Sequence, residues 1–189
     1  MKKVLLHICC GVCALGACER LKNEDYHVTG YFYNPNIALF GEYLARKQAV
    51  EKAALVSGIS LIVSDYLPGL WRDVCGKYPE EPEGGARCLI CYQERLKRTF
   101  DAAEGMEYDY FTTTLTISPH KSTAAIFKIG RRISPSKFLA IDFKSDDGFK
   151  KTMILAKQYN LYHQKYCGCE FSQTAPGSRL KAPGEEPKR

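Results

Sequence analysis

The 189-residue sequence lacks several features that would place it in a class at once. It contains no run of roughly 18 apolar residues, which excludes an ordinary membrane-spanning helix. It also contains no internal repeat, which excludes a repeat architecture. Its nine cysteines are too thinly spread for a small disulfide scaffold, whereas a hydrophobic fraction of 45% is enough for a full core. These absences leave a single globular domain that is rich in sulfur.

The first residues admit two interpretations. Met1-Lys2-Lys3, the apolar stretch that follows and Leu15-Gly16-Ala17-Cys18 together resemble a lipoprotein signal. However, cleavage before Cys18 would remove the only segment that can serve as a first strand. We therefore expect a cytoplasmic protein without membrane attachment. In that compartment thiols stay reduced, and clustered cysteines act as metal ligands or redox groups.

Positive charge is concentrated in the second half of the chain. Between Lys121 and Lys165 there are ten Lys and Arg residues against three Asp, whereas the formal net charge of the whole chain is +6. Such a basic region indicates either a polyanionic partner, with nucleic acid the first candidate, or an ordinary solvated helix face. The distribution of charge leaves both interpretations open.

Alternating strand and helix patterns predict an α/β fold with a five-stranded parallel sheet, a three-layer sandwich with helices on both faces. Residues 1–172 would form this single domain, with a cysteine-rich insertion at 65–91. The Pro, Gly and charged residues of 173–189 predict a disordered tail. The expected strands span residues 3–8, 28–33, 59–63, 108–115 and 137–143. The expected helices span residues 12–22, 41–57, 91–103, 119–132 and 148–159.

The first strand leads directly into Cys9-Cys10-Gly11-Val12-Cys13. A turn at the carboxyl end of such a strand is where α/β proteins usually place their chemistry. Adenylating enzymes built on this kind of sandwich carry a Ser-Gly-Gly-x-Asp-Ser phosphate loop at that position. A lone glycine without a hydroxyl cannot form such a loop. The sequence therefore argues against ATP use and for a site built on sulfur.

A second group of cysteines, Cys88-x-x-Cys91, follows a long irregular stretch. By itself it fits half of a zinc site, a dithiol redox pair or half of a cluster site. Together with Cys9 and Cys10 it offers four thiolates from two loops, which suits zinc or a 4Fe–4S cluster. Adjacent cysteines are awkward ligands for a single tetrahedral zinc ion, and this favours the cluster.

The remaining cysteines fall into three kinds. Cys13 lies just inside the first predicted helix, whose dipole favours a thiolate, so it is a candidate ligand or nucleophile, or else a small buried residue. Cys18 and Cys75 have no partner at a spacing that indicates a metal site or a redox pair, and they are expected to pack in the interior. Cys167-Gly168-Cys169 would close a small, strained disulfide ring, which is typical of a redox-active pair. Metal ligation or surface exposure of these two thiols is the alternative.

Five motifs in this order resemble those of the QueH-type epoxyqueuosine reductases, and the match runs from about residue 3 to residue 172. The family usually has Ala-Pro where this chain has Gly11-Val12, which loosens the turn but leaves every sulfur in place. The motifs are Leu6-His7-Ile8-Cys9-Cys10-x-x-Cys13, Tyr33-Asn34-Pro35-Asn36-Ile37, Glu81-Pro82-Glu83-Gly84-Gly85-Ala86-Arg87-Cys88-x-x-Cys91, Phe111-Thr112-Thr113-Thr114-Leu115-Thr116-Ile117-Ser118-Pro119-His120-Lys121 and Tyr166-Cys167-Gly168-Cys169-Glu170.

The resemblance implies a nucleotide-hydrolase-like fold of the HUP or PP-loop type, a Rossmannoid sandwich. It implies an oxidoreductase that reduces epoxyqueuosine to queuosine at the wobble position of a tRNA anticodon. Within that resemblance, four thiols would hold a 4Fe–4S cluster and two would form a redox-active pair, supplied by an unidentified electron donor. The implied cluster ligands are Cys9, Cys10, Cys88 and Cys91, and the implied redox pair is Cys167 with Cys169.

A tRNA partner would use the basic half of the chain, because phosphate contacts supply affinity and splayed anticodon bases stack on aromatic rings. The candidates for stacking are Tyr162, Tyr166, Phe111 and Tyr33, although Phe111 also fits a buried core position.

Removal of an epoxide oxygen as water requires two electrons and two protons, whereas one cubane cluster passes one electron at a time. The two-thiol pair has the right stoichiometry for the second reducing site. The other possibility is a second, Lewis-acidic iron held by Cys13 and Asp142. His120 and Asp142 are candidate proton donors. A zinc-stapled RNA-binding module without catalysis, and a metal-free thiol–disulfide oxidoreductase, are the competing hypotheses.

Overall fold

The computed structural model describes residues 1–172, and the predicted tail at 173–189 lies outside the described residues. Its sheet has four strands, all parallel, in the order β3-β2-β1-β4. Strand β1 is central, with Val4 opposite Val28 on one side and opposite Tyr110 on the other. The strands are β1 (Lys2–His7), β2 (Tyr26–Phe32), β3 (Ser60–Val63) and β4 (Tyr110–Thr113).

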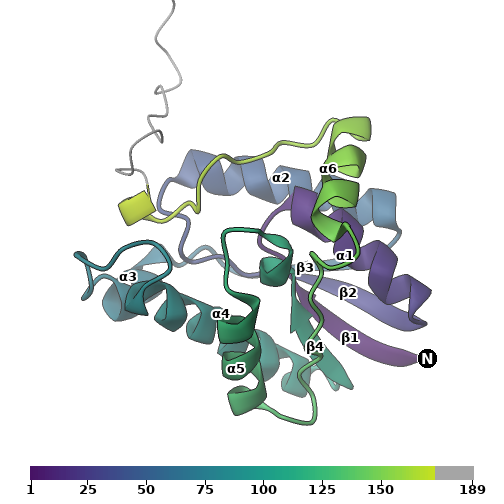
Figure 1. Ribbon diagram of the computed structural model, residues 1–189, viewed down its shortest axis with the longest axis horizontal. Helices are drawn as coiled ribbons and strands as arrows, with labels where there is room; N and C mark the ends of the chain where they lie inside the picture. Colours follow the sequence, from purple (N-terminus) through teal and green to yellow (C-terminus); the bar gives the residue numbers. More distant parts are fainter. Residues whose placement is uncertain (173–189) are drawn as a thin grey trace, which may run out of the picture.

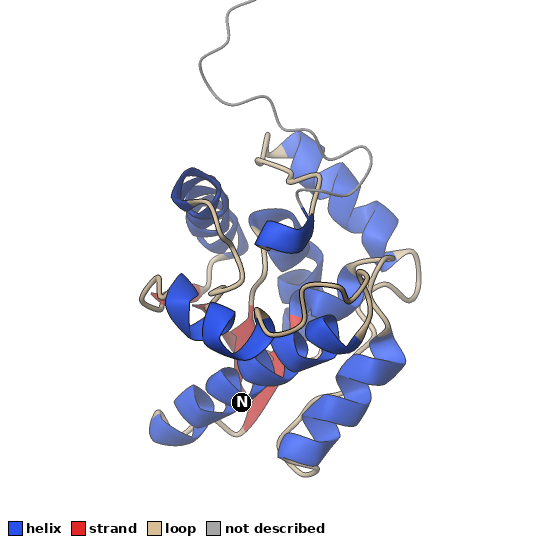
Figure 2. Ribbon diagram, turned by 90° about the vertical axis from the view of Figure 1, so that its left-hand side faces the viewer, coloured by secondary structure: helices blue, strands red, loops and turns tan. Residues whose placement is uncertain are grey.

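Helices cover both faces of this sheet (Figures 1 and 2). Helices α1, α2 and α6 pack together on one face, and α4 with α5 covers the other. The predicted α/β fold with a parallel sheet is therefore confirmed. The helices are α1 (Gly11–Asn23), α2 (Phe40–Ser57), α3 (Pro68–Cys75), α4 (Ala86–Gly105), α5 (Thr123–Ile133) and α6 (Gly148–Gln158), with the 3-10 helices η1 (Thr114–Ile117) and η2 (Glu170–Ser172).

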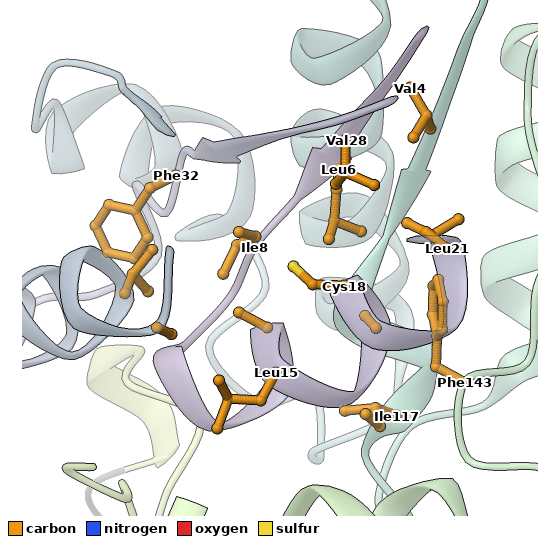
Figure 3. Close-up of a cluster of buried hydrophobic side chains, with 14 of the residues drawn as sticks. Val4, Leu6, Ile8, Leu15, Cys18, Leu21, Val28, Phe32, Ile117 and Phe143 are labelled. Carbon is orange, nitrogen blue, oxygen red and sulfur yellow. The ribbon is translucent and has the colours of Figure 1, made fainter. Parts of the chain in front are cut away.

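The central strand explains the two layers of core. Successive side chains of a strand point to opposite faces, so Leu6 packs with α1 while Leu5 packs with the α4 side. Figure 3 shows Cys18 of α1 among the apolar side chains that face Leu6 and Ile8. Cys18 is fully buried there, which confirms the prediction that it is a packing residue.

The fifth strand predicted at 137–143 is wrong. Only Phe138 bridges to Phe111 of β4, in a single parallel pair. Strand β4 ends at Thr113 and the chain turns into η1, so no further ladder is offered. Instead, the hydroxyls of Thr112 and Thr116 donate to the carbonyls of Leu139 and Ile141, at 2.8 and 2.9 Å. Threonine side chains thus replace the ladder, and the apolar 137–143 segment packs at the sheet edge without being a strand.

Two helices begin at positions that matter for the thiols. Helix α4 begins at Ala86, five residues before the predicted start, so Cys88 and Cys91 both lie in its first two turns. Helix α1 begins at Gly11, against which α2 packs so closely that a β-carbon would lie 2.3 Å from the carbonyl oxygen of Ala49. The glycine that departs from the family pattern therefore permits a close helix contact. No helix in residues 1–172 has the length and apolar character needed to cross a bilayer.

Candidate thiol-rich active site

Three sulfur atoms converge at the turn between β1 and α1. The Sγ atoms of Cys9 and Cys10 are 3.9 Å apart, and those of Cys10 and Cys13 are 2.7 Å apart. All three lie within 4.8 Å of one another, and they form the one group of three or more potential metal ligands this close together in residues 1–172. We call these residues the N-terminal triad. Cys13, whose role the sequence left open, is a full member of it.

Local hydrogen bonds build this turn. Cys10 caps α1, since its Sγ accepts a hydrogen bond from the backbone N–H of Cys13 at 3.3 Å. Thr114 at the start of η1 accepts from the N–H of Cys9 at 3.0 Å, and its hydroxyl donates to the Sγ of Cys9 at 3.3 Å. Asn34 donates to the carbonyl of Ile8 at 2.9 Å. The turn is thus fixed by the threonine run and the Asn-Pro-Asn turn that the sequence places far from it.

The three thiols of the N-terminal triad are electrostatically unlike. Hydrogen bonds from the Cys10 and Cys13 thiols, with help from Lys121 and Arg95, hold the pKa of Cys9 well below its usual range. Burial raises the pKa of Cys10 to about 12. The hydrogen bonds that Cys13 donates to Cys10 and Cys9 raise its pKa. Without metal, negative charge therefore collects on Cys9.

A buried polar network lies beneath the turn. Arg95 of α4 donates from Nε to the Nε2 of His7 at 3.3 Å and from Nη2 to the Oδ1 of Asn34 at 2.5 Å. The Nε2 of His7 also lies 3.1 Å from the carbonyl oxygen of Tyr33, and its Nδ1 pairs with the hydroxyl of Thr113 at 2.8 Å. Burial, together with the charge of Arg95, lowers the pKa of His7 to about 3, so the ring stays neutral.

Cys88 and Cys91 occupy the next site along α4. The Sγ of Cys88 accepts from the N–H of Gly84 at 3.2 Å. Cys91 is buried against Cys75 of α3, and a hydrogen bond from the Cys75 thiol lowers the pKa of Cys91 to about 7. Cys75 is fully buried, as predicted for a packing residue, and it packs beside Cys91. Neither Cys88 nor Cys91 belongs to the N-terminal triad.

The C-terminal pair, Cys167 and Cys169, lies in the chain that crosses from α6 toward α3 (Figure 1). Arg46 of α2 donates to the carbonyl of Cys167 at 2.9 Å and to that of Tyr166 at 3.0 Å. Gly168 between them has φ +104°, a conformation that favours glycine. A hydrogen bond from Cys169 holds the pKa of Cys167 well below its usual range, with support from Lys121 and Arg95. Both thiols are free, as are the other seven, so the expected disulfide is not formed.

A cavity of about 780 Å³ joins the two thiol regions at the carboxyl end of the sheet. Cys9 and Cys13 of the N-terminal triad and Cys167 of the C-terminal pair all line it. The remaining charged and aromatic lining residues include Glu83, His120, Lys121, His163, Lys165 and Tyr166.

Some predicted site residues lie away from this cavity. Asp142 does not line it, and its Oδ1 accepts from the hydroxyl of Thr123 and the N–H of Lys144, both at 3.3 Å. Tyr33 and Phe111 are buried, so neither presents a ring for base stacking. Tyr162 is 41% exposed and Tyr166 lines the cavity, so these two tyrosines keep that capacity.

Two arginines were missed by sequence reasoning. Arg95 lies four residues after Cys91, a spacing that puts both on one face of a helix and that could have drawn attention to it. Arg46 has no such signal, because its partners, the Tyr166 and Cys167 carbonyls, lie about 120 residues away.

The donor chemistry fits a thiolate-bound metal or iron–sulfur group. Soft thiolate ligands select zinc, copper(I) and iron–sulfur clusters over hard cations. Cys9 and Cys88 pack against the same core cluster, and Arg95 lies four residues after Cys91 on α4. A four-iron cluster is larger than a single ion, so its ligands need not converge as closely as the N-terminal triad does. The residues present are therefore compatible with either kind of group.

A parallel α/β sheet that presents clustered thiols beside a cavity at its carboxyl edge defines a thiol-dependent α/β protein of the metal-binding or redox class. A family model described as Epoxyqueuosine reductase QueH matches residues 4–175. The chain belongs to this family, and the expectation of an oxidoreductase of the QueH type is confirmed at the level of the family.

Individual relatives agree with this assignment. The Epoxyqueuosine reductase QueH of Streptococcus pyogenes is 34% identical over 94% of this chain and 72% of its own length. The protein of the same name from Thermotoga maritima is 32% identical over 91% of both chains. A solved structure described as a predicted subunit of a tRNA methyltransferase from Methanocaldococcus jannaschii has a TM-score of 0.54 at 16% identity, covering 83% of this chain and 75% of that one. This last likeness concerns the fold alone.

Proposed function

We propose that the chain reduces epoxyqueuosine to queuosine in a tRNA anticodon, with an iron–sulfur cluster and a redox-active cysteine pair. The observation that carries the proposal is the shared cavity. It brings Cys9 and Cys13 of the N-terminal triad to the same space as Cys167 of the C-terminal pair. A substrate in that space would meet both sulfur regions at once.

Cys9, Cys10, Cys88 and Cys91 are the proposed ligands of a 4Fe–4S cluster. A four-iron cluster, when bound, supplies electrons one at a time. The lowered pKa values of Cys9 and Cys91 favour the thiolate form that ligation requires. The elevated pKa of Cys10 has burial as its main cause, and a bound cation would offset that cost.

The C-terminal pair is the proposed two-electron store. Oxidation of the Cys167 and Cys169 thiols to a disulfide releases two electrons and two protons. Reduction of an epoxide to an alkene consumes the same number and releases the oxygen as water. Cys167 lines the cavity and has a lowered pKa, which suits it to be the thiolate of the pair. An external electron donor would then restore the dithiol.

Two further roles remain part of the proposal. A second metal ion held by Cys13 and Asp142 would require the Asp142 carboxylate to leave Thr123 and the backbone N–H of Lys144. His120 is exposed and lines the cavity, so it is the better placed of the two proposed proton donors.

The tRNA would bind across the β4 edge, toward the cavity. Helices α5 and α6 lie on opposite faces of the sheet beside this edge (Figure 1). Both expose basic side chains, and Lys121 and Lys165 continue the positive charge into the cavity. Contacts with phosphate from such residues would make binding strongly dependent on salt. The exposed basic residues are Lys128, Arg131 and Arg132 on α5 and Lys150, Lys151 and Lys157 on α6.

Elemental analysis of anaerobically isolated protein tests this proposal most directly. We expect iron with acid-labile sulfide and conversion of epoxyqueuosine in tRNA by the chemically reduced protein. Cys88→Ala should lose both iron and conversion, whereas the matched control Cys18→Ala, in the apolar core, should keep both. One zinc ion per chain with no conversion would contradict the proposal and favour an RNA-binding module.

A further inference from the structure

Arg95 is the most unusual charge in residues 1–172. It is 2% exposed, and none of the described carboxylates lies within salt-bridge distance of it. Its hydrogen bonds to His7 and Asn34 go to neutral groups. A buried ion without a counter-charge costs several kcal/mol or more, so such a residue needs compensation from elsewhere.

The other buried arginines show how compensation is usually arranged. Arg46 forms an ion pair with Glu42 at 2.6 Å. Arg87 donates to the carbonyls of Tyr78 and Pro79, at 2.7 and 3.0 Å, and lies 4.3 Å from the centre of the Phe171 ring. Arg95 has neither an acidic partner nor a ring contact among the described residues.

Arg95 lies among the groups that hold the thiols. Cys91 is four residues before it on α4, and its partner Asn34 also donates to the carbonyl of Ile8, next to Cys9. The charge of Arg95 interacts with Cys9, Cys91 and Cys167. These three thiols come from three separate segments of the chain.

We infer that Arg95 is a positioning residue and the built-in counter-charge of an anionic metal–thiolate centre, which its guanidinium shares with the C-terminal pair. This inference rests on the proposed function, because it needs the thiols to carry negative charge on a bound group. It adds a residue that holds three thiol segments in register and that raises the reduction potential of the group they hold. The fixed positive charge stabilises the more negative, reduced form.

The test compares Arg95→Met, Arg95→Lys and the matched control Arg98→Met, whose side chain is exposed one turn further along α4. Each full-length, anaerobically reconstituted protein is assayed for the rate of iron loss to EDTA and for its midpoint potential. We expect Arg95→Met to lose iron roughly 10-fold faster or more, as for other residues that orient metal ligands. Its potential should shift to a more negative value.

Arg95→Lys keeps the charge but not the planar fork, so its potential should return toward the wild-type value while iron loss stays faster. Arg98→Met should match wild type in both measurements. An Arg95→Met protein with wild-type potential and iron retention overturns the inference, and so does an Arg95→Lys protein with the potential of Arg95→Met.

Asn34→Asp keeps the test decisive if Arg95→Met does not fold. It places a carboxylate where the Asn34 amide now accepts from Arg95, which cancels the charge without removing the side chain. We expect the same negative shift in potential, and an unchanged potential would overturn the inference. A wild-type protein that binds no iron would instead refute the proposed function, and this inference with it, whereas an effect missing only in the variants refutes this inference alone.

Discussion

The N-terminal triad and the C-terminal pair face the same cavity but are built in different ways. The triad lies between a strand and a helix, and Cys10 itself caps that helix. The C-terminal pair lies in a segment without a strand or long helix, and Arg46 and the N–H of Ala38 hold its backbone carbonyls. The triad is therefore built by residues close together in the sequence, whereas the backbone of the C-terminal pair is held in place by residues far from it in the sequence.

Helix α2 supports both regions from one face. Ala49 packs against Gly11 beside the triad, and Arg46, three residues earlier, holds the C-terminal pair. A change that disrupts α2 as a whole should therefore affect both thiol regions, whereas loss of a single contact should affect only one of them.

Removal of one triad thiol should abolish the chemistry while leaving the fold. Cys9→Ser should lose the bound metal group and reduce the conversion of epoxyqueuosine to background, because Cys9 carries the charge of the metal-free triad. Iron analysis and nucleoside analysis of tRNA measure the two effects. A Cys9→Ser protein with full iron content would show that the triad is not the binding site.

Loss of the Arg46 contacts to the C-terminal pair should lower the stability of the fold and the conversion of epoxyqueuosine, but not the iron content. Arg46→Met removes the ion-pair partner of the buried Glu42 carboxylate, which keeps only a hydrogen bond from the Tyr162 hydroxyl, and it frees two carbonyls. We therefore expect about 3–5 kcal/mol lower free energy of unfolding. Iron content should stay near the wild-type value.

Lys47→Met is the matched control, because Lys47 forms an exposed ion pair with Glu51 on the same helix. Its loss should cost less than about 1 kcal/mol in a denaturant titration. If Arg46→Met loses iron to the same extent as it loses conversion of epoxyqueuosine, the two thiol regions form one unit and are not supported separately.

Acid should lower the stability of the folded protein through His7, in the buried network beneath the triad. The pKa of His7 is about 3 in the folded protein against 6.5 as the ordinary value, so between these pH values the unfolded chain binds a proton that the folded chain does not. Stability therefore falls as pH falls, by about 3 kcal/mol between pH 7 and pH 4 from this group.

Denaturant titrations at both pH values measure this loss. His7→Gln should show a smaller decrease in stability than wild type over the same interval, although it starts from a less stable protein. His27→Gln changes an exposed histidine and should behave as wild type. An unchanged acid dependence in His7→Gln would mean that His7 is not the group responsible.

The smallest effect concerns the contact between the triad and α2. Gly11→Ala would place a methyl group 2.3 Å from a backbone oxygen of Ala49, so we expect a loss of about 1–3 kcal/mol in thermal or denaturant unfolding. Gly41→Ala, also on α2, meets nothing within 4 Å and should be neutral or slightly stabilising. Equal effects of the two changes would contradict the close approach.

Most of the fold and part of the site were predictable. Strand β1 and helix α1 were placed by short-range patterns, and so was the group of thiols at their junction. The predicted fifth strand failed because its apolar pattern says nothing about where β4 stops, and β4 stops at Thr113. Tyr33 was misplaced as a stacking residue because its ring packs beside Tyr31, 6.1 Å away between centres, on the buried side of β2.

The sequence by itself determined which chemistry is available: clustered thiols where a phosphate loop would lie, at the end of a first strand. Such features depend on residues a few positions apart, through strand alternation and helix capping. Only the tertiary structure decided that Cys13 joins the triad, that Arg46 holds the C-terminal pair and that Arg95 is buried against His7 and Asn34 beneath the thiol turn. The partners of a buried charge are chosen in space and not along the chain, and a hydrogen-bond partner of Arg95 lies 88 residues away from it in the sequence.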